Sequence, residues 1–380
     1  MILISAFLAF TVLVAILAEL SARWCLARAR YYVWPPSYQC DNELLPSAFT
    51  GMQGTSRFSI NRDGERGDEP PAPEARAFRI LVAGGSTTEC YFLDQSDTWP
   101  AQLQSELNKS DWGRNAGVSG VYVSNIGRSG VDSTGVLTIL EHIIPQHPRL
   151  DAVILMTGAG EILAWLRQGA DSQAELPRAN NETLFTFSPG RKYSWWPLRT
   201  TALANCWRHW RPRFLRSIEL RSNVGKSLTR LRRLRQNAKN IRKEVPSTAP
   251  LMSRYAKNLE AAIRSCQRRG IRVIVMPQPW LDVSLITSAK QSCLWNGSVG
   301  YAHSTDPTDY YDAGLMSQLM AEIYQQTAHT AESCGATVIP VQHLLQPMAE
   351  CFYDDVHFTP FGAAIVGRSL AAEIAKALGQ

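Results

Sequence analysis

The sequence has 380 residues, of which 45% are hydrophobic and 19% charged, and its formal net charge is +6. This composition excludes a wholly disordered chain and a membrane protein of many spans, and the length allows one large domain or two smaller ones. The basic residues gather between Arg191 and Lys243, so the net charge says little about the rest of the chain. Eight cysteines without a C-x-x-C pair do not support a zinc site built on cysteine pairs, and they leave the redox compartment open.

Residues 1–18 (MILISAFLAFTVLVAILA) carry no charge and are about the shortest stretch that spans a bilayer as a helix. A cleaved signal peptide is the alternative, but no Lys or Arg precedes the apolar run and no small-x-small cleavage site is evident. We therefore predict an uncleaved transmembrane anchor over residues 1–22. The arginines that follow it would stay in the cytoplasm by the positive-inside rule. A single short anchor that carries a large domain often departs from this rule, and we expect the domain on the periplasmic or extracellular side.

Residues 23–76 are predicted to form a loop-rich lead-in to the folded domain. They contain Pro35-Pro36, several glycines and the tract 63–74 (DGERGDEPPAPE). A charged, Pro-rich tract buries little surface, so we expect this one to lie outside the core.

Five short runs rich in Val and Ile then alternate with helical patterns. The runs are 78–83 (FRILVA), 121–126 (VYVSNI), 152–157 (AVILMT), 271–276 (IRVIVM) and 336–341 (ATVIPV). The helical patterns lie at 98–108, 252–269, 315–333 and about 360–378. Continuous apolar runs are typical of strands covered on both faces, as in a parallel sheet. The alternation predicts a doubly wound α/β sandwich with right-handed crossovers.

The stretch of about 162–250 is too long for one crossover, and we predict an inserted, largely helical subdomain there. It is basic and rich in tryptophan, with Trp195, Trp196, Trp207 and Trp210. It could contact anionic lipid headgroups, form a wall of a carbohydrate or acyl-chain site, or be a solvated helical hairpin. The hairpin would bury the helically spaced residues Leu220, Val224, Leu228, Leu231 and Leu234. Nucleic-acid binding is disfavoured by the anchor and by the lack of a stacking pattern.

The first apolar run leads directly into Gly84-Gly85-Ser86, at the carboxyl end of a strand, where parallel sheets place functional loops. Two glycines permit a tight turn that presents the serine hydroxyl at the start of a helix, whose free N–H groups suit an oxyanion. The alternative is a serine that only caps the helix. Neither a dinucleotide-binding nor a P-loop glycine pattern is present.

Near the C-terminus, His357 follows Asp354 by three positions. A serine needs an imidazole to accept its proton, and the imidazole needs a carboxylate to fix its tautomer and stabilise its positive charge. Three residues of separation can bring Asp354 back to the far ring nitrogen, whereas we expect the neighbouring Asp355 to point away. The alternative is a polar loop with a capping histidine. Cys90 is a weaker nucleophile candidate because no second base is apparent for it.

Taken together, these motifs resemble the SGNH/GDSL hydrolase superfamily. ILVAGGSTTE is similar to the first block of that family, with Gly85 in place of the usual Asp, as in a variant typical of membrane-anchored bacterial members. The segment from Asn125 to Gly130 (NIGRSG) is similar to the second block, and Asp354 with His357 to the fifth. Smaller matches are Trp99-Pro100, Gln278-Pro279 and residues 58–67 (FSINRDGERG). The resemblance covers about 58–160 and 252–378.

The resemblance implies a flavodoxin-like three-layer α/β/α sandwich with a five-stranded parallel sheet of order 2-1-3-4-5, within a hydrolase domain over 77–380. It also implies a triad of Ser86, His357 and Asp354. The backbone N–H groups of Ser86 and Gly130 would form the oxyanion hole.

One block departs from the family pattern. Family members carry Gly-x-Asn-Asp after the third strand, and the Asn side chain is an oxyanion donor; here Gly160 stands at the Asn position and Glu161 at the Asp position. Losing one such donor costs on the order of 10²–10³ in rate in other hydrolases. The hole could work with the two backbone N–H groups alone, another donor could replace the Asn, or the protein could be a weak or inactive enzyme. We expect Glu161 to be a helix-start residue that interacts with the helix dipole.

The sequence thus predicts a membrane-tethered serine esterase, an O-deacylase that needs no metal or organic cofactor. By resemblance, its substrate is an ester, such as an acetyl group on an envelope or secreted polysaccharide. The alternatives are an acyltransferase with the same acyl-enzyme and a non-catalytic scaffold of an envelope assembly. Protein partners are not specified by the sequence.

Overall fold

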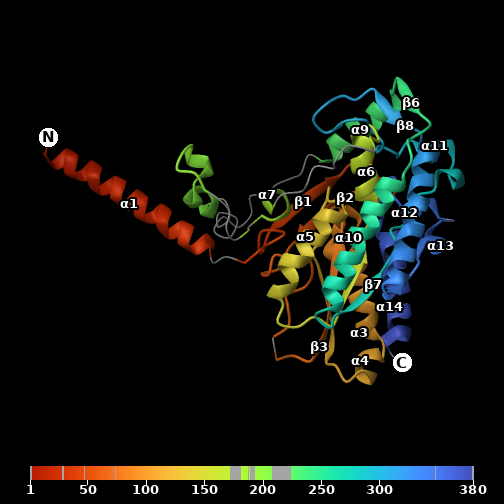
Figure 1. Cartoon of the computed structure of the whole chain (residues 1–380), viewed down its shortest axis with the longest axis horizontal. Coiled ribbons are helices and arrows are strands. Elements are labelled where there is room, and N and C mark those ends of the chain that lie inside the picture. The colour runs from red at the N-terminus through yellow and green to blue at the C-terminus, as the bar shows by residue number, and fades with distance from the viewer. Residues whose placement is uncertain are drawn as a thin grey trace.

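The computed structural model describes residues 2–27, 30–46, 48–72, 74–171, 181–186, 188, 193–207, 224–346 and 348–378. A long helix, α1 (Ile2–Ala27), projects from a body in which helices pack on a central sheet (Figure 1). Within the described residues, α1 is the one helix long and apolar enough to cross a membrane, and its side chains are almost entirely exposed. The buried side chains of α1 lie towards its C-terminal end and are Glu19, Ala22 and Leu26.

The central sheet has five parallel strands in the order β4-β3-β5-β7-β9, so the expected order 2-1-3-4-5 is confirmed. The strands are β3 (Ala77–Gly84), β4 (Gly120–Asn125), β5 (Ala152–Met156), β7 (Arg272–Val275) and β9 (Thr337–Val338). All five coincide with predicted apolar runs. β9 is shorter than its run because the ladder ends at Ile339, whose N–H donates to Val275, and Pro340 has no N–H to continue it.

Helices cover both faces of this sheet, which gives the three-layer α/β/α sandwich. On one face, α5 (Ser133–Ile143), α10 (Ala249–Gln267) and α12 (Ala313–Ser333) pack against Leu81, Val153 and Val275. On the other face, α3 (Trp99–Lys109) and α14 (Pro360–Leu378) pack against Ile80, Val82 and Ile154. Successive strand residues therefore enter opposite cores, as the continuous apolar runs predicted.

The lead-in contains more regular structure than the sequence indicated. β1 (Gln39–Leu44) and β2 (Gly54–Ser59) form an antiparallel hairpin. The expectation that the tract 63–74 lies outside the core is wrong at Glu65 and Arg66, which are 4% and 2% exposed. Arg66 is buried because its guanidinium donates to the backbone carbonyls of Glu89, Cys90 and Leu93, which leaves the charge well hydrogen-bonded.

The described parts of the insertion are α6 (Ala159–Arg167), α7 (Asn181–Leu184), a helix at 202–207, α9 (Val224–Gln236) and β6 (Asn240–Arg242). β6 pairs in parallel with β8 (Asp309–Tyr311). Leu228 and Leu231 are buried and Leu234 partly so, as the helical spacing predicted. Trp210 and Leu220 lie outside the described residues.

Short helices complete the described structure. They are α2 (Ser86–Glu89), α4 (Trp112–Asn115), α11 (Ser288–Gln291) and α13 (Gln342–Leu345), with 3-10 turns at Gln95–Asp97, Ile144–Gln146, Leu198–Thr200, Val283–Leu285 and Ala349–Cys351.

Candidate active site

The chain turns sharply between β3 and α2, and this turn presents Ser86. Gly84 cannot carry a side chain here, because a Cβ would lie 2.1 Å from Thr88 Oγ1 and 2.2 Å from the Met156 carbonyl oxygen. α2 is one turn long and ends at Cys90, which has a left-handed conformation with φ of 53°. The donors near Ser86 are therefore local backbone N–H groups rather than the end of a long helix dipole.

The loop before α14 brings a histidine back to Ser86. Asp354 Oδ1 accepts hydrogen bonds from the backbone N–H groups of Val356 (3.0 Å) and His357 (2.9 Å), which folds the loop around the carboxylate. His357 Nδ1 then lies 2.8 Å from Asp354 Oδ2, and His357 Nε2 lies 2.7 Å from Ser86 Oγ. Because an ionised carboxylate only accepts, the proton of the first bond sits on Nδ1 and leaves Nε2 to accept from the serine.

Burial and charge act on Asp354 and His357 in opposite directions. Burial alone would raise the pKa of Asp354, but the charge of His357 and the hydrogen bonds it receives hold this pKa below its usual value. Burial alone would lower the pKa of His357, but the charge and hydrogen bond of Asp354 outweigh it and raise this pKa above 6.5. One of the bonds to Asp354 comes from Trp295, whose indole Nε1 donates to Oδ2 at 2.9 Å.

Asp355 points away from the histidine ring. Its Oδ2 accepts hydrogen bonds from the backbone N–H groups of Trp295 (3.1 Å) and Asn296 (3.3 Å) and from the Asn296 side chain (3.1 Å). Burial and the neighbouring Asp354 raise the pKa of Asp355. Asp355 therefore holds the loop that supplies Trp295 and does not compete for the imidazole.

The turn that follows β4 is fastened to α2. The Asn125 amide donates to the Thr88 carbonyl (2.7 Å), and its Oδ1 accepts from Gly127 N–H (2.7 Å). A Cβ on Gly127 would lie 2.5 Å from the backbone nitrogen of Glu89, so only glycine lets the two segments approach this closely. The Glu89 carboxylate accepts from the Ser129 hydroxyl, and burial raises the pKa of Glu89 to about 6. These contacts fix the turn whose last residue is Gly130, which is exposed and has φ of +78°.

Gly160, at the position of the expected asparagine, has no room for a side chain. It lies in the first turn of α6, and a Cβ there would be 2.1 Å from the carbonyl oxygen of Val131. Glu161 is buried and accepts from the Ser133 N–H (3.0 Å) and hydroxyl (2.8 Å), with Arg254 as its ion-pair partner (3.2 Å). Glu161 therefore joins α6 to α5 and α10 and does not contact Ser86.

Restoring the family asparagine by Gly160→Asn is expected to destabilise the protein. The new Cβ must displace the Val131 backbone, and overpacking of this kind costs about 1–3 kcal/mol. We expect thermal unfolding to shift down for Gly160→Ala and Gly160→Asn alike. Gly85→Ala is the matched control, because a Cβ on Gly85 would meet nothing closer than 4.0 Å and its φ of −86° suits any residue. An unchanged unfolding midpoint in Gly160→Ala would contradict this account.

The basic insertion supports the loops around this site. Arg232, on α9, donates to the carbonyls of Cys293 (3.0 Å) and Tyr353 (2.7 Å), which flank Trp295 and Asp354 in the sequence. Arg235 donates to the carbonyls of Asn296 and Tyr311. These arginines thus bind backbone carbonyls of the body rather than forming only a solvated face.

One further candidate from the sequence, Cys90, and the nearby carboxylate of Asp132 do not contribute to the arrangement around Ser86. Cys90 is buried, and burial raises the pKa of its thiol to about 12, which leaves it un-ionised near neutral pH. Asp132 caps α5 by accepting from Gly135 N–H at 2.9 Å. Arg66, Glu89, Trp295 and Arg232 had no assigned role in the sequence, although the segments that resemble the family pattern contain Arg66 (residues 58–67) and Glu89 (ILVAGGSTTE).

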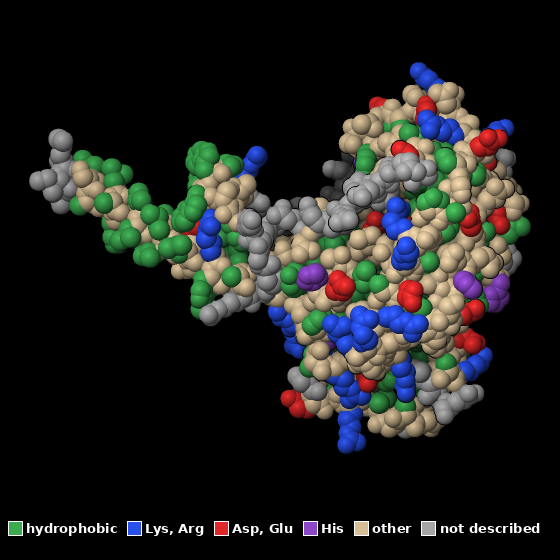
Figure 2. Space-filling view, in the orientation of Figure 1, with side chains coloured by type: hydrophobic (Ala, Val, Ile, Leu, Met, Phe, Trp, Pro, Cys, Tyr) green, Lys and Arg blue, Asp and Glu red, His purple; other side chains and the backbone are tan. Residues whose placement is uncertain are grey.

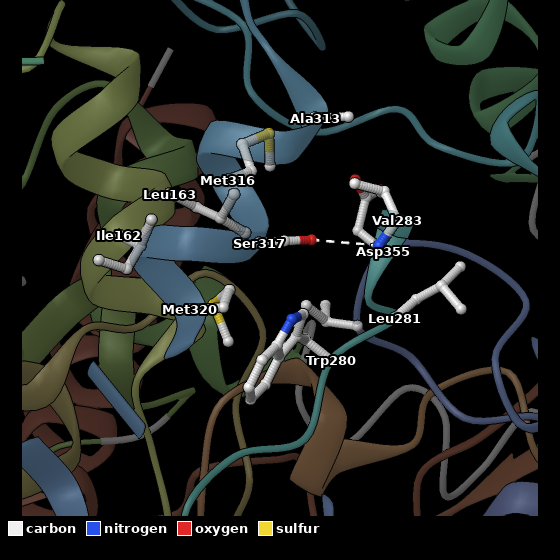
Figure 3. A pocket seen from close by; sticks show the side chains of 11 residues that line it. Ile162, Leu163, Trp280, Leu281, Val283, Ala313, Met316, Ser317, Met320 and Asp355 are labelled. Carbon is white, nitrogen blue, oxygen red and sulfur yellow. Dashed lines mark hydrogen bonds between the residues drawn. The ribbon is translucent and has the colours of Figure 1, made fainter. Parts of the chain in front are cut away.

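A small apolar pocket borders the loop of Asp354 and His357 (Figure 3). Its walls come from α6, α12, the segment after β7 and the loop itself, and its lining includes Ile162, Trp280, Met316, Met320 and Val356. In Figure 3 the Ser317 hydroxyl points across the pocket to Val283, whose N–H it accepts at 3.2 Å. Ser86 and His357 are not among the lining residues, so we do not assign this pocket to the reacting group.

No protein-family model matches the chain, and no curated protein matches it either. Solved structures that are similar to it include a member of the lipolytic G-D-S-L family from Veillonella parvula, with 14% identity and a TM-score of 0.39 over 77% of this chain and 96% of that one. A lipase/acylhydrolase from Enterococcus faecalis has 13% identity and a TM-score of 0.39 over 79% and 96%. An acetylxylan esterase from Geobacillus stearothermophilus has 14% identity and a TM-score of 0.40 over 79% and 95%.

Proposed function

We propose that this protein is a serine esterase that acts through an acyl-enzyme on Ser86. The observation that carries the proposal is the continuous chain of hydrogen bonds from Ser86 Oγ through His357 to the buried Asp354. A serine, an imidazole and a carboxylate at these distances form the arrangement that activates a hydroxyl for acyl transfer. The resemblance of the sequence motifs to the SGNH/GDSL family supports the same assignment independently of the distances.

The proposed reaction has two halves. His357 Nε2 takes the proton of Ser86 as Oγ bonds to the ester carbonyl carbon, and the backbone N–H groups of Ser86 and Gly130 stabilise the oxyanion. The alkoxide then leaves, takes the proton from His357 and departs as the alcohol, with the acyl group on Ser86. Water then attacks the carbonyl carbon of the acyl-enzyme while His357 takes its proton. His357 returns this proton to Ser86 Oγ, and the carboxylic acid is released.

For the substrate, we propose O-acetyl esters of an envelope or secreted carbohydrate, as the sequence resemblance implies. We further propose that α1 anchors the chain as a single transmembrane helix, with the catalytic domain on the periplasmic or extracellular face. Protease added to intact cells should then degrade the domain; complete protection until the cells are lysed would place it in the cytoplasm.

A fluorophosphonate probe tests the proposed function directly. The full chain in detergent should become covalently labelled, and intact-mass analysis after digestion should place the adduct on Ser86. Absence of labelling in a folded protein would favour the non-catalytic scaffold. Product analysis with p-nitrophenyl acetate, with and without an acetylatable sugar, then separates hydrolysis from transfer, since an acyltransferase would form sugar acetate at the expense of free acetate.

The pH dependence of activity should report His357. The base form of the ring is neutral, and the raised pKa means that protons remain on the ring to a higher pH than in an unperturbed histidine. We therefore expect kcat/KM to rise with pH through a midpoint above 6.5 and to level off above it. Steady-state rates with a soluble ester between pH 5 and 9 would measure the midpoint. A midpoint below 6.5 would contradict the electrostatics described for this pair.

A further inference from the structure

A carboxylate in the anchor helix contacts the insertion. Glu19 follows the uncharged run of residues 1–18 and is only 4% exposed. Its two oxygens accept hydrogen bonds from the backbone N–H groups of Ala202 and Leu203, each at 2.9 Å, at the start of the helix 202–207. Arg23, one turn further along α1, donates to the same carboxylate at 2.9 Å. An acidic group beside an apolar helix is costly unless it is paired, and here the insertion and Arg23 pair it.

Apolar and aromatic contacts add to the hydrogen bonds between α1 and the insertion. Ala22 and Leu26 of α1 form a small buried cluster with Ala202, and Tyr193 packs against it. The Arg23 guanidinium lies over the Trp195 ring, 4.6 Å from its centroid. Residues 193–207, here called the tryptophan segment, therefore form one unit with the C-terminal end of α1. In Figure 1 this light-green segment lies beside that end of α1 and away from the central sheet.

The remaining surface of the tryptophan segment is unusually apolar. Large side chains that are 45–77% exposed project from it: Trp195, Trp196, Leu198, Leu203 and Trp207. Figure 2 shows hydrophobic side chains gathered on this segment and continuing along α1. Soluble proteins rarely expose so many large apolar side chains together, so this face is expected to contact another protein or a membrane. Tryptophan is enriched where proteins meet the polar–apolar boundary of a bilayer.

The position of Glu19 sets the depth of the segment relative to a bilayer. Eighteen helical residues span about 27 Å at 1.5 Å per residue, close to the roughly 30 Å of a hydrocarbon core. If residues 1–18 fill the core, Glu19 falls at its boundary. The tryptophan segment is bonded to Glu19 and so lies at the same depth, among the headgroups. The exposed face of the segment is thus continuous with the lipid-facing surface of α1.

We propose that the tryptophan segment is an interfacial platform, which inserts its exposed tryptophans and leucines into the headgroup layer of the bilayer that α1 spans. Glu19 couples the platform to the anchor helix. The insertion thereby gives the catalytic domain a second attachment at the membrane surface, besides the chain that leaves α1 directly. This inference concerns the membrane and does not depend on the esterase chemistry.

Tryptophan quenching in vesicles tests the proposal. The full chain is reconstituted into vesicles of phosphatidylcholine and phosphatidylglycerol, with or without lipids brominated close to the headgroup. The chain has eleven tryptophans, so the quenched part of the emission must be assigned by variants. In the variant W195F/W196F/W207F most of the bromolipid quenching should disappear. The control W112F/W280F removes two buried tryptophans whose indole N–H groups have no hydrogen-bond partner in the described structure, and it should keep the quenching.

Glu19→Ala tests the coupling. This variant should still float with the vesicles through α1, but its bromolipid quenching should fall, and cleavage by added protease within residues 193–207 should increase. Full quenching in the triple tryptophan variant, or failure of the unmodified chain to float with vesicles, would overturn the platform. Unchanged quenching and protection in Glu19→Ala would overturn the role of Glu19. Hydrolysis of a soluble ester should be unaltered in every variant, so a failure of the proposed esterase function would be seen separately.

Discussion

Replacing Ser86 by alanine should lower ester hydrolysis by roughly 10⁴- to 10⁶-fold, the range expected when a triad serine is removed. The substitution deletes the one atom that lies 2.7 Å from His357 Nε2 and is positioned to attack a carbonyl carbon. The fold should be unaffected, because Ser86 is only partly buried and alanine keeps the Cβ of the serine. Stopped-flow release of p-nitrophenol should show a burst in the unmodified chain and none in the variant.

Ser96→Ala provides the control for the Ser86 variant. Ser96 is exposed and lies ten residues further along the chain, so its substitution should leave both the burst and the steady-state rate unchanged. If Ser86→Ala kept the burst or the fluorophosphonate label while Ser96→Ala behaved as expected, the nucleophile would have to be sought elsewhere. Equal thermal unfolding midpoints in the two variants would show that the loss of rate is chemical rather than structural.

Much of the fold and the core of this site could be predicted because they depend on local patterns. The five apolar runs predict buried parallel strands, and the carboxyl ends of such strands meet at one edge of a sheet. That rule alone brings the turn of Ser86 and the turn ending at Gly130 together. Asp354 and His357 are three residues apart, so their contact depends on one short loop. A local sequence motif is therefore enough to predict it.

The supporting residues could not be predicted, because their partners are distant in sequence. Trp295 is 59 residues from Asp354, and Arg232 is 121 residues from Tyr353. Arg66 was expected outside the core because it lies in a charged tract. In the structure it is buried and donates to the carbonyls of Glu89 and Leu93, which are more than 20 residues further along the chain. The prediction for the tract 63–74 depended on its average composition. An average cannot identify the single charged residue that finds hydrogen-bond partners inside the protein.

Gly160 shows how the structure changes the meaning of a sequence feature. From the motif alone, this glycine is a missing oxyanion donor. In the structure, the Val131 carbonyl occupies the space that a side chain at position 160 would need. An asparagine therefore does not fit here unless the Val131 backbone moves. Any compensating donor must come from a backbone N–H group or from another segment.

The second large effect is expected from Asp354→Asn, which should lower kcat by about 10⁴-fold. The amide oxygen can still accept from the N–H groups of Val356 and His357, so the loop should keep its shape. His357 Nδ1 lies 2.9 Å from Asp354 Oδ1 and 2.8 Å from Oδ2, and Oδ2 also accepts from the Trp295 indole N–H. An amide nitrogen at the Oδ2 position opposes both of these donors, so the preference for a proton on Nδ1 weakens. The tautomer with its proton on Nε2, which cannot take the proton of Ser86, is then favoured. Losing the carboxylate should also lower the pKa of His357 and move the acidic limb of the rate profile to lower pH.

Asp355→Asn is the matched control, since it changes the same functional group one residue away. Among the residues that the structure describes, the Asp355 side chain accepts from Trp295 and Asn296, and an amide oxygen can keep those bonds. The loss of its charge removes a lesser contribution to the raised pKa of His357, so we expect a small acidic shift and a rate within about tenfold of the unmodified chain. Rates fitted over the full pH range would separate the two effects. If Asp355→Asn were as damaging as Asp354→Asn, the carboxylate that orients His357 would have been assigned to the wrong residue, because Asp354 is the one of the two that bonds to Nδ1.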